Sequence, residues 1–328
     1  MTAYVLRRVA GLVPLLIGIT FVSFLVIRLA PGGPVGAAGA MNPKLTAQAR
    51  EKMQALYGLD RPLLVQYASW SRRVACFDFG RSFTDGEAVT AKISRAVPVT
   101  LAINLLSLLF IFALGVPLGV YSAVKKGTRL DNVLTTATMA AFSVPTFWLA
   151  LLLMSLFGVY WRILPVSGIT SFVSEDFTPL ERVVDMARHL VLPVFVSAIT
   201  GLAGISRFMR ASLLETLGQP YVRAARAKGL PENKVLYGHA VRNALLPTVT
   251  LLGLSVPGLL GGSVVFETVF SIPGMGRLFF QSVFTRDYPV IMGILVLGAV
   301  LTLLGNLAAD VAYHFLDPRI RVKQEDSR

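Results

Sequence analysis

The chain alternates between long apolar runs and polar segments, and six of the runs contain no Asp, Glu, Lys or Arg. Each run has the length that an α-helix needs to cross the hydrocarbon core of a bilayer, roughly 17–25 residues or more. A soluble protein could bury six such helices only inside a far larger polar shell. The pattern therefore predicts an all-α polytopic membrane protein with six transmembrane helices. The runs are residues 9–27, 97–124, 132–161, 189–206, 243–266 and 288–309.

The composition supports a membrane protein. Hydrophobic types make up 54% of the 328 residues and charged types only 15%, whereas soluble domains are about 25% charged. The first run is predicted to be a retained span and not a cleaved signal peptide. Its apolar part is long, and Arg28 and residues 29–34 follow it without a clear small-residue cleavage site.

The basic excess follows the predicted topology and does not indicate a nucleic-acid partner. The formal net charge is +13. Six spans place both termini on one side, and the segments on that side carry more Lys and Arg than the short loops on the other. The positive-inside rule then predicts a multi-pass membrane protein with both termini in the cytoplasm. Anionic membrane lipid would support such a basic inner face.

The spans divide the chain into four segments. The polar residues 30–96 predict a small extracytoplasmic subdomain with helical stretches near 45–57 and 62–74 and a turn at 77–80. Gly58 ends the first stretch and Pro62 forbids its continuation. The predicted segments are 1–29 (tail and first span), 30–96, 97–316 (transmembrane core with the cytoplasmic loop 207–242) and 317–328 (cytoplasmic tail).

Proline and glycine residues interrupt several of the apolar runs. Proline removes a helical hydrogen bond, and glycine lets backbones approach closely. Membrane helices tolerate such breaks beside a neighbouring helix or a water-lined cavity. They are candidates for kinks along a transport pathway, and ordinary helix packing is the competing explanation. The candidates are Pro117, Pro145, Pro257, Gly261 and Gly262.

Enzymatic and metal chemistry is not expected of this chain. Cys76 is its single cysteine and its three histidines lie far apart, which predicts no disulfide and no metal site. No glycine is followed by lysine, so a phosphate-binding loop is absent from the sequence. We therefore expect no catalytic residues and no cofactor, and any ATP that drives transport would be bound by another subunit. The lack of charge within the spans argues against an ion-coupled carrier.

The longest predicted cytoplasmic loop contains a short helix. Pro220 can occupy a first helical position, residues 221–228 are mostly good helix formers, and Gly229 predicts the stop. Pro231 then opens a second helix over residues 232–246. A helix of about nine residues is marginal alone in water, so something must hold it.

One face of this short helix is predicted to dock into a groove of another protein. The helical spacing places Tyr221, Ala224, Ala225 and Lys228 together. The alanines would permit close approach and Tyr221 would serve as an anchor, while Arg223 and Arg226 would lie to the side, available to acidic groups. The alternative is a helix lying on the inner membrane face of this protein itself.

Two motifs resemble a known family. Residues 223–229 and 239–247 are similar to the EAA-type loop of ABC importer permeases, with Arg223 where the general pattern has Glu. The rest of the chain, over roughly residues 1–320, resembles the B-type subunit of dipeptide/oligopeptide permeases, although that family often has Asp at the position of Gly33. The motifs that carry this resemblance lie at 28–34, 57–62, 77–82, 274–276, 286–290 and 317–319.

The resemblance implies a location in a bacterial plasma (inner) membrane, a type I ABC importer permease fold and a division of labour. This chain and a homologous second permease would form the pathway for di-/oligopeptides, with two ATP-binding subunits and an extracytoplasmic solute-binding protein. The implied ATPase-coupling residues are Tyr221, Arg223, Ala224, Ala225, Lys228, Gly229 and Pro231.

Three other functions stay open from the sequence. The first is an importer of the same class with another cargo, such as a nickel chelate, glutathione or a peptide antibiotic. The second is a stand-alone channel or ion-coupled carrier. The third is a membrane scaffold without a pathway, which only the lack of charge within the spans supports.

Overall fold

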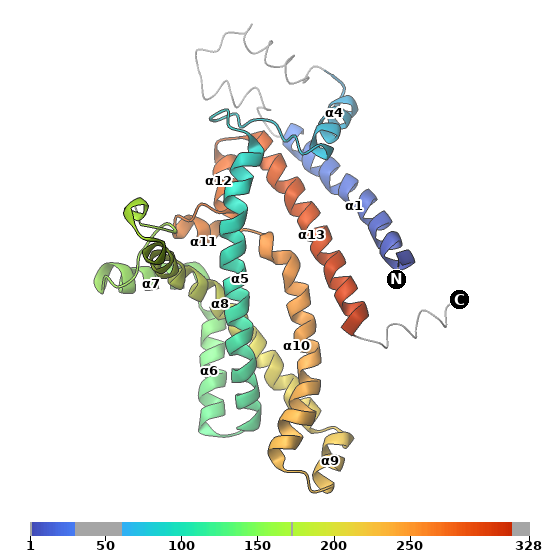
Figure 1. The fold of residues 1–328 in the computed structure, drawn as a ribbon, viewed down its shortest axis with the longest axis vertical. Helices are drawn as coiled ribbons and strands as arrows, with labels where there is room; N and C mark the ends of the chain where they lie inside the picture. The colour runs from blue at the N-terminus through green and yellow to red at the C-terminus, as the bar shows by residue number, and fades with distance from the viewer. Residues whose placement is uncertain (1, 30–60, 172, 317–328) are drawn as a thin grey trace. The chain divides into compact units, whose positions relative to one another are not determined.

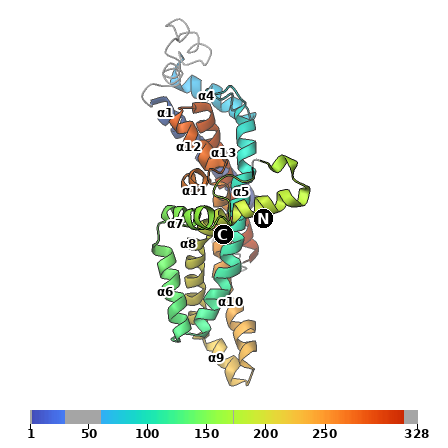
Figure 2. The same ribbon diagram turned by 90° about the vertical axis from the view of Figure 1, so that its left-hand side faces the viewer.

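The computed structural model describes residues 2–29, 61–171 and 173–316, and these are almost entirely helical (Figures 1 and 2). Within these ranges the β-structure is a single isolated bridge between Arg81 and Ala88. The helix α4, Leu63–Ala75, confirms the helix predicted near 62–74. The helix predicted near 45–57 and the tail 317–328 lie outside the described residues.

The remaining helices follow in chain order. They are α1 (Thr2–Leu29), α5 (Val89–Val124), α6 (Arg129–Ser143), α7 (Thr146–Leu153), α8 (Pro179–Leu217), α9 (Pro220–Ala227), α10 (Arg242–Ser255), α11 (Val264–Val269), α12 (Met275–Phe284) and α13 (Tyr288–Leu316). Two π-helical segments, Met154–Tyr160 and Lys234–Val241, continue α7 and precede α10. Short 3₁₀ turns lie at Ser174–Asp176 and Val256–Leu260.

Four continuous helices are long and apolar enough to cross a membrane. They agree with the first, second, fourth and sixth predicted spans. Their candidate spans are Ala10–Leu29, Val89–Val124, Pro179–Leu217 and Tyr288–Leu307.

The third predicted span is bent. Arg129–Ser143 and Thr146–Tyr160 are long and apolar enough to cross a membrane only as a pair, and the chain bends by 98° between them. Pro145 lies at the N-cap of α7. The break follows from proline, because the preceding residue is disfavoured in the helical region, and Val144 has extended backbone angles.

The fifth predicted span, residues 243–266, is not one helix. α10 ends at Ser255, a 3₁₀ turn follows, and α11 begins only at Val264. Pro257 cannot donate a backbone hydrogen bond, and Gly258, Gly261 and Gly262 favour irregular backbone. The described residues therefore support four spans, or five if the bent pair counts as one.

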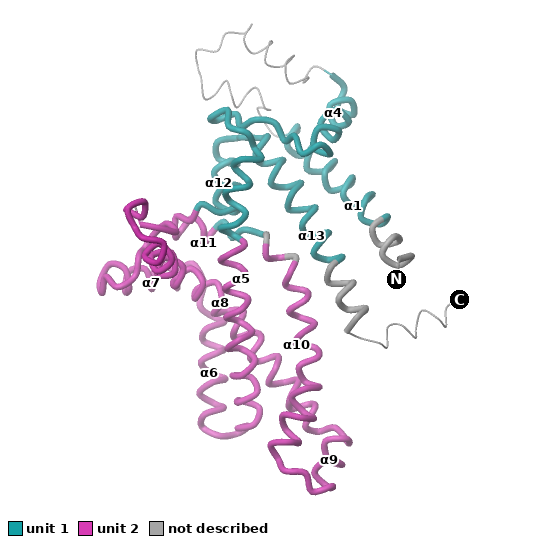
Figure 3. The backbone as a smooth tube through the Cα atoms, in the orientation of Figure 1, with its two compact units in different colours: residues 1–100, 260–264, 273–311 teal, residues 101–259, 265–272, 312–328 magenta. Residues whose placement is uncertain are grey.

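The chain divides into two compact units (Figure 3). Unit 1 comprises residues 1–100, 260–264 and 273–311, and unit 2 comprises residues 101–259, 265–272 and 312–328. In unit 1, α4 packs on α1 through aromatic rings: those of Phe24 and Tyr67 lie 5.5 Å apart. The hydroxyl groups of Thr20 and Tyr67 share a hydrogen bond of 2.9 Å.

A buried carboxylate organises the start of α13 in unit 1. Asp287 is fully enclosed and accepts hydrogen bonds from the backbone N–H of Phe83, at 3.0 Å, and from the Thr84 hydroxyl, at 2.9 Å. The Ser82 hydroxyl also donates to it. Because a buried charge needs such partners, Asp287 ties the turn at residues 82–84 to the helix that follows it.

In unit 2, α8 packs against α6 and α5 (Figures 1 and 2). Gly115 and Gly119 form a Gly-x-x-x-Gly pattern at the contact with α8. A Cβ on Gly119 would lie 2.8 Å from the Cβ of Met209 and 3.1 Å from the backbone nitrogen of Arg210. α5 continues through Pro117, so this part of the second span serves helix packing.

We predict that Gly119→Ala lowers the stability of the chain, because the added methyl group overpacks the contact with Met209. Overpacking costs about 1–3 kcal/mol. The measurement is the midpoint of thermal unfolding in detergent. Gly204→Ala on α8 is the matched control, since its Cβ would meet no described atom within 4 Å. Equal midpoints for the two variants would contradict the close contact.

Candidate coupling site

The short helix predicted in the long loop is present as α9. α8 ends at Leu217, and α9 follows with Gln219 at its N-cap and Pro220 in the first turn. Lys228 caps its C-terminus, and Gly229 has a φ of +73°. Glycine adopts this left-handed conformation without the steric cost that a side chain would add, so the predicted stop at Gly229 is confirmed.

The inner face of α9 is held by the chain itself. Val222 is 0% exposed and Ala225 is 8% exposed, in a hydrophobic core that also contains Met209 and Leu213 of α8. The same core includes buried residues of the π-helical segment and the start of α10: Val235, Leu236, Ala240 and Ala244. This burial supplies the support that a helix of eight residues lacks on its own.

The docking face predicted for α9 is divided by this packing. Ala225 is buried in the core that α9 shares with α8 and α10, so it does not belong to the accessible face. Tyr221 is 42% exposed, and Arg223, Ala224 and Lys228 are exposed as well. Val222 and Ala225 are three residues apart and therefore lie on the same side of α9, which faces the core. The accessible face is narrower than predicted because it does not include Ala225.

Polar contacts fix both ends of α9. Asn243 donates from Nδ2 to the Tyr221 hydroxyl and to the backbone carbonyl of His239, each at 3.0 Å. Arg226 forms a bidentate pair with Glu232, at 2.6 and 3.1 Å, across the turn that contains Gly229. The pair holds the pKa of the Glu232 carboxyl below its usual range. Arg226 was predicted to be available to acidic groups of a partner, but it pairs with Glu232 of the same chain. Pro231, in the same turn, is exposed.

Asp131 in unit 2 is a buried carboxylate, as Asp287 is in unit 1, and the sequence analysis did not predict its role. Asp131 is 3% exposed and accepts two hydrogen bonds from Arg210 of α8, at 2.9 and 2.7 Å. The Ser122 hydroxyl of α5 donates to it at 2.5 Å, and the backbone N–H of Gly127 at 3.0 Å. The network joins α5, α6 and α8. The spacing from Thr128 to Asp131, typical of a helix N-terminus, is the sequence signal that could have indicated it.

The pathway candidates are divided between the two units. Pro117 lies within α5, Pro145 begins α7, and Pro257 lies in a 3₁₀ turn, all in unit 2. Gly261 and Gly262 belong to unit 1. There the backbone of Gly262 comes within 3.0 Å of the point where a Cβ of Gly276 would lie. The role of all five in a pathway stays a prediction.

Comparison of the sequence with known protein families identifies the family of this chain. The family profile described as "Binding-protein-dependent transport system inner membrane component" matches residues 115–322. The profile of the N-terminal part of such components matches residues 1–104. The chain belongs to this family. It is a multi-pass protein of the inner membrane, and α9 lies in the region that the first profile covers.

Relatives of this transport component match over nearly their whole length. The oligopeptide transport system permease protein AppB of Bacillus subtilis is 40% identical, with 98% of this chain and 99% of AppB covered. The dipeptide transport system permease protein DppB of Escherichia coli is 36% identical, with 99% and 100% covered. The inward-facing MetNI methionine ABC transporter gives a TM-score of 0.54 at 20% identity, covering 70% of this chain and 97% of that chain. Its likeness shows the type I ABC importer permease fold.

We predict that Asp131→Ala destabilises the transport component, because Arg210 then loses its carboxylate partner. Loss of a charge-assisted hydrogen bond that leaves a partly buried group unpaired costs about 1–3 kcal/mol. Thermal unfolding of the purified chain measures the effect.

The control is the double variant Asp131→Ala with Arg210→Met, which removes both charges. It is expected to recover much of the lost stability. A double variant no more stable than Asp131→Ala alone would show that the unpaired guanidinium is not the cause.

Proposed function

We propose that this chain is one of two homologous permease subunits of an ABC importer for di-/oligopeptides, with α9 as the helix that a separate ATP-binding subunit grips. The observation that carries the proposal is the division of α9 between a buried face and an exposed one. Val222 and Ala225 are anchored in the core of the chain, while Tyr221, Arg223, Ala224 and Lys228 face outward.

The anchored face makes α9 able to transmit a displacement. Because close-packed interiors have low compressibility, a push on α9 moves the ends of α8 and α10 together with it. Two polar contacts support this linkage. Tyr221 is bonded to Asn243 of α10, and the Ser212 hydroxyl of α8 donates to the Ala244 carbonyl of α10 at 3.0 Å.

The exposed face has the chemistry of a docking surface. Arg223 and Lys228 are positive, and no described carboxylate lies within salt-bridge distance of either group. Ala224 between them permits close backbone approach, and Tyr221 offers aromatic contact area. Such a surface suits an acidic-rimmed groove on an ATP-binding subunit.

In this proposal, ATP hydrolysis in one subunit drives helix movement in another. ATP binding and hydrolysis take place in the partner subunits, which displace α9. The displacement is passed to α8, whose side chain Arg210 holds α5 and α6 through Ser122 and Asp131. These helices move as a group, which changes the side to which the pathway opens.

The cargo proposal is supported by the relatives, which are named for oligopeptide and dipeptide transport. A solute-binding protein would deliver the peptide from outside, and both termini of this chain would face the cytoplasm. The test is reconstitution of the full complex in proteoliposomes, followed by uptake of a labelled dipeptide. Uptake that depends on ATP and on the binding protein is the expected result. Uptake by this chain alone would indicate a carrier, and uptake of only a nickel chelate or glutathione would replace the peptide cargo.

We predict that Ala224→Trp weakens association with the ATP-binding subunit at least about tenfold, since the indole would block the groove; tenfold corresponds to about 1.4 kcal/mol. Co-purification in detergent and titration by light scattering measure it. Ala225→Trp is the contrasting variant. It overpacks the core of the chain and is expected to lower the unfolding midpoint itself. Normal association of a folded Ala224→Trp variant would refute docking on this face.

We predict that Gly229→Val uncouples transport while membrane insertion stays intact. A β-branched residue at a φ of +73° strains the turn, at about 1–2 kcal/mol, and shifts the Arg226–Glu232 pair that spans it. Peptide uptake and binding-protein-stimulated ATPase activity are the measurements. Gly229→Asn, which tolerates this conformation, is the control. Wild-type uptake and ATPase activity in Gly229→Val would contradict the coupling assignment.

A further inference from the structure

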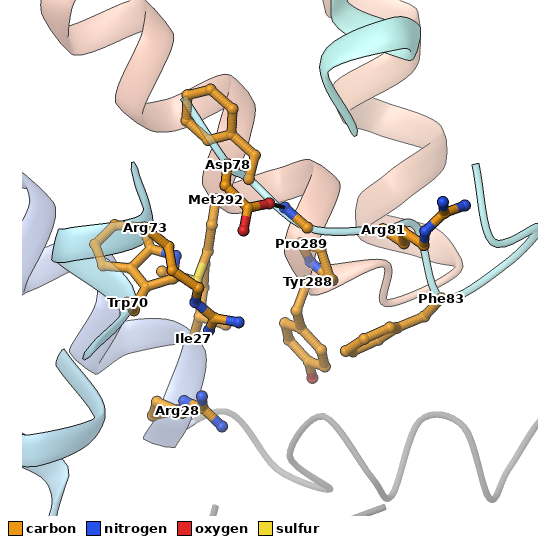
Figure 4. A pocket seen from close by; sticks show the side chains of 12 residues that line it. Ile27, Arg28, Trp70, Arg73, Asp78, Arg81, Phe83, Tyr288, Pro289 and Met292 are labelled. Atoms are coloured by element: carbon orange, nitrogen blue, oxygen red, sulfur yellow. Dashed lines mark hydrogen bonds between the residues drawn. The ribbon is translucent and has the colours of Figure 1, made fainter. Parts of the chain in front are cut away.

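A small cavity in unit 1 has three arginine side chains and one carboxylate on its wall: Arg28, Arg73, Arg81 and Asp78. It measures about 90 Å³ and lies between the end of α1, the helix α4, the turn after α4 and the start of α13 (Figure 4). Its apolar lining includes Ile27, Trp70, Phe83 and Met292. Its charged lining includes Arg28 and Arg73.

The cavity lies where two candidate spans have an end. Arg28 is the penultimate residue of the candidate span Ala10–Leu29, and Tyr288 is the first residue of the candidate span Tyr288–Leu307. The apolar run 9–27 ends directly before Arg28, and Arg286 and Asp287 directly precede the apolar run 288–309. Charged residues flank a span where it leaves the hydrocarbon core. The ends of two spans therefore meet at the membrane surface, where Trp and Tyr are enriched, and Trp70 and Tyr288 both line the cavity.

Arg28 and Arg73 form no ion pair with a described residue. No described carboxylate lies within salt-bridge distance of either guanidinium, and the two cations repel each other. Arg28 contacts the ring of Phe24, with its Cζ 5.2 Å from the ring centroid. The Asp78 carboxylate, also on the wall, accepts the backbone N–H of Gly80 at 3.0 Å.

The third arginine of the lining is engaged elsewhere. Arg81 donates to the Gly86 carbonyl at 2.9 Å, and its guanidinium points away from those of Arg28 and Arg73 (Figure 4). An anion placed between Arg28 and Arg73 would relieve their repulsion and accept their N–H groups. The fork of a guanidinium matches the oxygens of a phosphate group.

We propose that this cavity binds the phosphodiester headgroup of an anionic phospholipid, with Arg28 and Arg73 holding the phosphate oxygens. The site is independent of the cargo and of α9. It would fasten α1, α4 and the start of α13 to one lipid molecule at the membrane surface.

The test is a titration of the purified full-length chain with dioctanoyl phosphatidylglycerol, with bound copies counted by native mass spectrometry. Dioctanoyl phosphatidylcholine and inorganic phosphate are the comparison probes. Arg73→Gln and Arg28→Gln are each expected to weaken phosphatidylglycerol binding at least about tenfold, the loss of one charge-assisted hydrogen bond. Phosphatidylcholine and inorganic phosphate should bind at least tenfold more weakly than phosphatidylglycerol.

Arg72→Gln is the matched control, because Arg72 precedes Arg73 on α4, is exposed and does not line the cavity. It should bind phosphatidylglycerol as the unaltered chain does. Equal weakening by Arg72→Gln would show a diffuse charge effect and overturn the site. Equal binding of phosphatidylcholine, or displacement of the lipid by an equal concentration of inorganic phosphate, would also overturn it. If Arg28→Gln does not insert, Arg73→Gln outside the span decides the question.

Discussion

The packing of Val222 and Ala225 into a core shared with α8 and the helix after Gly229 is the contact on which the position of α9 depends. Without it, α9 would be too short to persist as a helix in water. With it, the exposed side of α9 is presented at a fixed angle. The helix is therefore both a part of the fold and an accessible surface, and the proposed coupling role requires both.

Buried carboxylates fix the helix ends in both units. Asp131 joins three helices in unit 2 through Arg210, Ser122 and Gly127. Asp287 joins the turn after α4 to the start of α13 in unit 1. Each has several hydrogen-bond partners, because a buried carboxylate without them would be too costly. In a membrane protein, where apolar packing between helices competes with lipid contacts, such polar ties specify which helix ends meet.

Two of the six predicted spans are interrupted by irregular backbone, which their apolar content did not indicate. The stretch 243–266 has the composition of a span, yet α10, a 3₁₀ turn and α11 replace one helix. The stretch 132–161 bends by 98° near Pro145. Both outcomes follow from proline and glycine chemistry. Hydropathy measures length and polarity and is insensitive to a missing hydrogen bond.

The sequence by itself determined the helical membrane class, four continuous spans, the position of α9 and its stop at Gly229. These depend on local composition and on backbone preferences that neighbouring residues carry. Only the tertiary structure decided which side of α9 is buried, that Arg226 pairs with Glu232, and that Asp131 meets Arg210. Those choices depend on contacts between residues far apart in the chain, such as the 79 positions that separate Asp131 from Arg210. Helical periodicity defines a face but not the element that will cover it.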